Sequence, residues 1–160
     1  MPPTMTSTLV LCSGDAHQSD QGAGVHAMHY LREHYDLPDT TYANADSADA
    51  SLATAIAAAD NVIILNAAQI DASPGTVRVV EKDVAELADL IDTVALEGPL
   101  PKRFVLISIQ PGELGPGDSL SEPVRRSMPK AAGTAATYVY RWQRGESVFS
   151  TGLHSLPNSV

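Results

Sequence analysis

The stretch that decides the fold reads LVLCSGDAHQSDQGAGV and spans residues 9–25. Its first four residues are apolar, as in a buried strand, and the polar loop after them leads into a helix predicted over residues 22–34. The first parallel strand of an open α/β sheet ends in this way, and such sheets bind ligands beyond the carboxyl ends of their strands. The amino end of a helix adds N–H groups and a positive dipole end. We therefore expect the functional site in this loop.

Length and charge limit the possible classes of protein. The chain has 160 residues, which suits a single domain over residues 1–160. The chain has ten Lys and Arg residues and nineteen Asp and Glu residues, and the resulting net charge of −9 argues against a nucleic-acid partner. Residues 1–7 do not resemble a signal peptide, and no apolar run approaches the ~20 residues of a membrane span. We expect a soluble cytoplasmic monomer with flexible tails at residues 1–7 and 146–160. Cys12, the only cysteine, lies in an apolar run and is predicted to be a buried structural thiol.

Hydrophobic periodicity predicts alternating strands and helices. The expected strands cover residues 8–13, 42–45, 61–66, 76–80 and 104–109. The expected helices cover residues 22–34, residues 50–59, a segment from Asp83 that ends at Gly98, and a segment from Ser119 to about Trp142. Pro129 and Gly133 predict a kink or early fraying in the last helix. This order indicates an α/β fold, a three-layer α/β/α sandwich around a mostly parallel, twisted sheet of about five strands, with residues 76–80 at its edge.

The first loop also resembles the opening of a known family. Its glycines and acidic residues follow the pattern of the hydrogenase maturation endopeptidases, at Gly14, Asp15, Asp20, Gly24 and Val25. Weaker matches at comparable spacing extend the resemblance to about residues 8–145. The resemblance implies the same three-layer fold. It also implies a role in clipping the carboxyl-terminal tail from the large-subunit precursor of a nickel-iron hydrogenase once nickel is in place.

The resemblance also implies a site. The metal-ligand positions of the family fall on Gln21, Asn66 and Asp83, where two expected carboxylates have become amides. An amide oxygen is a weak neutral ligand, so nickel or another divalent metal is expected only if Asp83 and His17 rebuild the site. We expect these three positions to meet at one edge of the sheet, with Gln21 and Asn66 facing one cleft. Substrate contacts are expected from Gly14, Asp15, Asp20 and Asp46.

Simpler structural roles are available for the same residues. Asp20 suits an N-cap of the first helix, and this role is favoured over substrate contact. Asp83 likewise suits a helix cap, and Asn66 suits a turn after an apolar strand. His17 is expected to be an exposed loop residue.

Three classes of function remain open. The first is a maturation endopeptidase-like protein that processes or assembles a hydrogenase large-subunit precursor, with a metal site partly lost. The second keeps the fold and the partner, precursor or assembly factor, but binds without catalysis. The third is an α/β nucleotide-binding enzyme, which the chain supports poorly because it has neither a Gly-x-Gly-x-x-Gly fingerprint nor a Walker Gly-Lys-Ser/Thr sequence. A Ser-His-Asp hydrolase is weaker still, since no Gly-x-Ser-x-Gly elbow is present.

Overall fold

The computed structural model describes residues 6–46, 50–91 and 99–144. These residues build one five-stranded sheet in the order β2-β1-β3-β5-β4. The strands are β1 (Thr8–Cys12), β2 (Thr40–Asn44), β3 (Asn61–Ala67), β4 (Val77–Lys82) and β5 (Arg103–Ile109). The helices are η1 (Ser19–Gly22), α1 (Ala23–His34), α2 (Ala50–Ala58), η2 (Val84–Glu86), α3 (Leu87–Leu90), α4 (Glu122–Arg126) and α5 (Met128–Gln143). The predicted α/β class and the mostly parallel sheet are confirmed.

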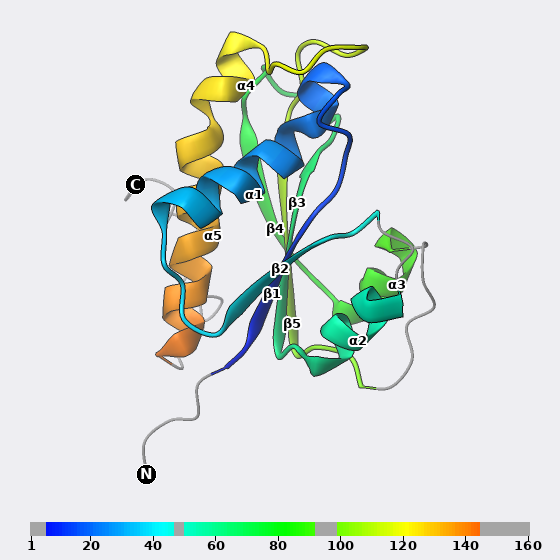
Figure 1. Ribbon diagram of the computed structural model, residues 1–160, viewed down its shortest axis with the longest axis vertical. Helices are drawn as coiled ribbons and strands as arrows, with labels where there is room; N and C mark the ends of the chain where they lie inside the picture. The colour runs from blue at the N-terminus through cyan, green and yellow to red at the C-terminus, as the bar shows by residue number, and fades with distance from the viewer. Residues whose placement is uncertain (1–5, 47–49, 92–98, 145–160) are drawn as a thin grey trace.

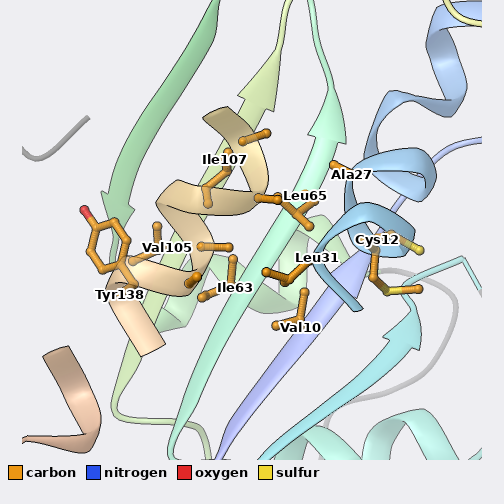
Figure 2. Packing of buried hydrophobic residues seen from close by; sticks show 14 of the residues in the cluster. Val10, Cys12, Ala27, Leu31, Ile63, Leu65, Val105, Ile107 and Tyr138 are labelled. Atoms are coloured by element: carbon orange, nitrogen blue, oxygen red, sulfur yellow. The ribbon is translucent and has the colours of Figure 1, made fainter. Parts of the chain in front are cut away.

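Helices cover both faces of the sheet (Figure 1). The α1, α4 and α5 helices lie on one face, and α2 and α3 lie on the other. The central strands β1 and β3 are therefore covered on both faces and buried, which explains why their sequences are continuous apolar runs. Figure 2 shows the larger core, in which Leu31 of α1 and Tyr138 of α5 pack over the sheet residues Val10, Ile63 and Val105. Cys12 belongs to the same cluster and is free and buried, as predicted.

The β4 strand reverses the direction of the sheet. The other four strands are parallel, whereas β4 pairs antiparallel with β5, with Val77 opposite Ile109 and Lys82 opposite Phe104. The chain therefore leaves β4 at the edge where the parallel strands begin. This reversal decides where Asp83 lies.

Two predicted helices differ from the structure. The helix expected from Asp83 begins as the single turn η2, continues in the four residues of α3, and ends because Ile91 has extended backbone angles; residues 92–98 lie outside the described residues. The last helix is divided at Ser127 into α4 and α5. Pro129 falls in the first turn of α5, where a missing N–H costs nothing, and α5 runs on through Gly133. The interruption predicted near Pro129 is therefore present at Ser127, two residues before the proline, whereas the helix is not interrupted at Gly133.

Part of the predicted amino-terminal tail is tied down. The N–H of Ser7 donates to a carboxylate oxygen of Asp60 at 3.0 Å, and the Gln143 side chain donates to the carbonyl of Thr6 at 2.6 Å. Residues 6 and 7 are thus anchored to the residue before β3 and to the end of α5. Residues 1–5 and the predicted tail at 146–160 lie outside the described residues.

Candidate functional site

A cleft of about 550 Å³ lies at the carboxyl ends of β1 and β2. It is lined by Gly14, Asp15, Ala16, Gln21, Val25, Asn44 and Asp46. Four of the sequence-predicted site residues, Gly14, Asp15, Gln21 and Asp46, are therefore brought together here. The cleft combines two exposed carboxylates with two exposed side-chain amides, and none of these described lining residues is cationic.

Asp46 is fixed to the end of β1. One of its carboxylate oxygens accepts from the N–H of Gly14 at 2.8 Å, and the other accepts from the hydroxyl of Ser13 at 3.3 Å. The Asp46 N–H in turn donates to the side-chain oxygen of Asn44 at 2.8 Å. These bonds join the loops after β1 and β2 and position one carboxylate at the mouth of the cleft.

Close backbone contacts shape the floor of the cleft. Gly14 has a φ of +123°, and a Cβ there would lie 2.0 Å from the Gln21 carbonyl oxygen. A Cβ on Gly24 would lie 2.2 Å from the carbonyl oxygen of Leu65, at the end of β3. Only glycine permits these approaches, and so the start of α1 packs directly against the ends of β1 and β3.

Asp20 has a role that differs from both sequence-based interpretations. Its side chain is fully buried. The carboxylate accepts from the N–H groups of Gly112 at 2.8 Å, Glu113 at 2.7 Å and Ser121 at 2.7 Å, and from the Ser121 hydroxyl at 2.6 Å. Neither η1 nor α1 has a side-chain cap, so the predicted N-cap role is wrong. Asp20 instead holds a loop about a hundred residues further along the chain, and it does not line the cleft.

These bonds also alter the acidity of Asp20. Burial alone would raise the pKa of the carboxyl group, but the hydroxyl and backbone donors favour its ionised form. The net result is a pKa below the ordinary value. Asp20 is therefore a buried anion stabilised by the loop that it holds.

Backbone bonds reinforce the contact between the two loops. Ser19 N–H donates to the Gly117 carbonyl at 2.8 Å, and Gly117 N–H donates to the His17 carbonyl at 2.9 Å. The exposed ring of His17 bonds through Nδ1 to Asp118 at 2.6 Å, which raises its pKa, with further contributions from the charges of Asp118 and Asp15. His17 is exposed, as predicted. We call this assembly of residues 17–20 with residues 112–121 the clasp.

Asn66 lies inside β3 rather than in a turn after it. The strand continues to Ala67 because β5 pairs with it along its whole length, with Asn66 opposite Ser108. The Ser108 hydroxyl donates to the Asn66 side-chain oxygen at 2.8 Å. Asn66 lies near the carboxyl end of β3, at the same end of the sheet as Gln21, but it is not among the residues that line the cleft, so the two residues do not share this cleft as predicted.

A neighbouring amide, Gln110, was not singled out from the sequence as a site residue. Its side chain is buried, accepts from the Ile70 N–H at 2.7 Å and donates to the Gln69 side chain at 2.8 Å. It thereby anchors the loop after β3. A polar residue directly after a buried strand was the signal that could have identified it.

Asp83 lies at the end of the sheet where the parallel strands begin, whereas Gln21 and Asn66 lie at the end where those strands finish. It follows Lys82, which pairs with Phe104, whereas Asn66 pairs with Ser108. Four residues along a strand separate these levels by roughly 13 Å. The prediction that the three positions converge is therefore wrong, because it did not allow for the reversed direction of β4. Asp83 caps η2 by accepting from the Ala85 N–H at 3.0 Å, which confirms its predicted role as a helix cap.

Comparison with known families and proteins identifies the fold. The model of the HycI family, described as hydrogenase maturation protease, matches residues 25–138. The chain belongs to the hydrogenase maturation protease family. The match begins at Val25 and so excludes most of the first loop, including Gly14, Asp15 and Gln21.

Individual relatives agree with this family. The hydrogenase expression/formation protein HupM of Azotobacter chroococcum is 27% identical over 155 residues, covering 87% of this chain and 74% of the relative. HupD of Rhizobium leguminosarum is 28% identical over 157 residues, covering 88% and 78%. The fold resembles the hydrogenase maturating endopeptidase HybD from E. coli, with a TM-score of 0.73 and 24% identity over 85% of this chain and 93% of that one.

The donor set of this family member does not fit a three-ligand metal site. Gln21 and Asn66 supply neutral amides, and the Asn66 oxygen already accepts from Ser108. The remaining ligand position, Asp83, lies at the other end of the strands, beside the start of β5. Within residues 6–46, 50–91 and 99–144, no three His, Cys, Asp or Glu side chains are grouped to hold a metal ion. A divalent ion prefers charged oxygen donors or neutral imidazole, which these positions do not provide together.

Within the described residues, every helix falls short of the length and apolar character that a bilayer-spanning segment needs.

Proposed function

We propose that this chain acts in the maturation of a nickel-iron hydrogenase by binding the large-subunit precursor, and that its own residues hold no catalytic metal. Membership of the protease family and the relatives named hydrogenase expression/formation proteins support the role in maturation. The position of Asp83 across the sheet from Gln21 and Asn66 carries the second part of the proposal. Nickel in the precursor then belongs to the bound partner and not to this chain.

The cleft is the proposed contact surface for the precursor. Gly14, Asp15 and Asp46 line it, while Asp20 acts through the clasp and positions the surrounding loops. An acidic chain with a net charge of −9 favours a neutral or basic protein surface and disfavours nucleic acid. We further propose that the protein works as a cytoplasmic monomer, where its single free thiol would remain reduced.

A nucleotide-binding role is not favoured. Gly22 and Gly24 face the backbone of Ala16 and Leu65, so the glycines that could have cradled a phosphate are used in packing. No observation supports a nucleotide site in their place.

One experiment separates binding from cleavage. The purified large-subunit precursor, with and without nickel, is mixed with this protein, and complex formation and precursor length are measured by gel filtration and mass spectrometry. We expect a complex whose precursor keeps its full length. A precursor shortened at its carboxyl terminus by the wild-type chain would contradict the loss of catalysis.

A ligand-restoring variant provides the matched control. The wild-type protein should show no nickel-dependent rise in melting temperature. Gln21→Glu combined with Asn66→Asp adds two carboxylates but leaves Asp83 at the other end of the strands, so this variant should also show no nickel-dependent rise in melting temperature. A rise in the wild type would contradict the proposed loss of the metal site.

A further inference from the structure

We propose that the free edge of β2 binds an extended segment of the precursor as a sixth strand, and that this strand leads the segment into the cleft. The inference rests on the proposed function and adds the surface and the mode of recognition. Its occupant is the carboxyl-terminal tail of the large-subunit precursor.

The backbone of β2 offers unpaired groups on its outer side. Thr8 N–H donates to the Asp39 carbonyl at 2.9 Å, and Ala45 N–H donates to the Cys12 carbonyl at 2.8 Å. Because alternate residues of a strand turn their N–H and C=O to the same side, the odd-numbered residues of this segment face β1. The backbone groups of Thr40, Tyr42 and Asn44 therefore point away from the sheet, and they have no hydrogen-bond partner among the described residues.

The two edges of the sheet differ in charge. The β4 edge carries Arg78, Glu81 and Lys82 within six residues, and such charges discourage the pairing of another strand. The β2 strand reads Thr-Thr-Tyr-Ala-Asn and has no charged side chain, proline or glycine. Of the two edges, only β2 is chemically suited to accept an extended backbone.

The β2 edge continues directly into the cleft. Asn44, the last residue of β2, lines the cleft together with Asp46, Gln21 and Gly14. A peptide that pairs with the five residues of β2 would cover roughly 17 Å and end beside these side chains. A terminal tail is the part of a precursor that is free to become extended, which is the form that pairs with an exposed sheet edge.

Tyr42 adds a side-chain surface beside the bound strand. Its ring lies under the guanidinium group of Arg32, with the Arg32 Cζ atom 5.1 Å from the ring centroid. Tyr42 is half-buried and packs against the core under α1, while Ala43 packs on the opposite face. The contact between Tyr42 and Arg32 thus links β2 to α1 and leaves the outer backbone edge of β2 uncovered.

Hydrogen exchange measures this pairing directly. The probe is a synthetic peptide of the carboxyl-terminal tail of the large-subunit precursor, tested beside the full-length precursor. We expect bound peptide to slow amide exchange at Thr40, Tyr42 and Asn44 by more than about tenfold, because each amide gains a partner. Exchange at Val77 and Val79 of the β4 edge serves as the internal control and should not change.

A pair of variants isolates the outward N–H of Tyr42. Tyr42→Pro removes this donor and no bond to β1, whereas Tyr42→Val removes the ring but keeps the donor. We expect the proline variant to bind the peptide about fivefold to tenfold more weakly than the valine variant. If Tyr42→Pro does not fold, exchange in the wild type still decides the question.

The outcomes distinguish the two proposals. Precursor binding without protection of the β2 amides, or equal affinities of the two variants, would overturn the sixth strand and leave the proposed function intact. Failure of the wild-type protein to bind the full-length precursor would overturn the proposed function itself. Protection of the β4 amides in place of those of β2 would assign the tail to the opposite edge and refute this inference.

Discussion

Replacement of Asp20 by asparagine should destabilise the protein strongly, although the two side chains have nearly the same shape. The carboxylate accepts four hydrogen bonds in a fully buried position. Asparagine keeps one acceptor oxygen and turns an NH₂ group toward at least one of these donors. One buried donor then loses its partner, and the remaining bonds lose the contribution of the negative charge.

The expected loss follows from these contacts. A hydrogen bond to a charged group contributes about 1.5–3 kcal/mol, and an unpaired buried donor costs about 1–3 kcal/mol. We expect Asp20→Asn to lower the free energy of unfolding by about 3 kcal/mol, which corresponds to a shift of about 1.5 M in the urea midpoint. The control is Asp36→Asn, at an exposed carboxylate, which should shift the midpoint by less than about 0.3 M.

The pH dependence has a definite sign. The pKa of Asp20 is lower in the folded protein than in the unfolded chain, so its stabilising contribution is complete above the ordinary value of about 3.9. The contribution is lost as the pH falls through the folded-state pKa. The difference between wild type and Asp20→Asn should therefore narrow below about pH 4. A loss of under about 1 kcal/mol at pH 7 would refute the assignment of Asp20 as the centre of the clasp.

Two further predictions concern the floor of the cleft and the outer part of the clasp. Gly24→Ala should lower the melting temperature by about 6–12 °C, because the new methyl group would meet the Leu65 carbonyl. Gly115→Ala is the control, because its Cβ would lie in open space and only its φ of +101° would cause strain, so the melting temperature should fall less. Equal shifts of the two melting temperatures in calorimetry would argue against the close contact at Gly24. The His17 pKa, followed by NMR, should fall toward about 6.5 in Asp118→Asn. The ion pair between His17 and Asp118 stabilises the fold below the unfolded-state pKa of His17, and this effect is lost as the pH rises through the folded-state pKa. A His17 pKa that is the same in wild type and Asp118→Asn would exclude the contact in solution.

Local patterns were sufficient to predict most of the fold. The strands over residues 8–12 and 61–67 were evident because a central parallel strand must be apolar on both faces. Loop and glycine signals located the other strands to within a few residues. The third helix was predicted as one continuous element from Asp83, whereas the described residues form the single turn η2 and the four residues of α3, followed by an extended backbone at Ile91.

The site depended on information that local sequence does not contain. Sequence shows that residues 76–80 form a strand, but its direction depends on pairing with β5, and this direction places Asp83 at the far edge. The clasp joins Asp20 to Ser121 across 101 positions, so no local pattern indicates it. Asp20 also illustrates a general ambiguity, because an acidic residue before a helix can cap that helix or bind donors elsewhere.

The contact of Gly24 with Leu65 has a consequence for how this protein can change during evolution. The start of α1 and the ends of β1 and β3 are held together by main-chain packing and by the clasp, neither of which uses the side chains of Gln21 or Asp46. Substitutions of side chains that line the cleft can then alter what is bound there without disturbing the packing of α1 on β1 and β3. The side chains that line the cleft and the atoms that hold its surroundings together are therefore largely different.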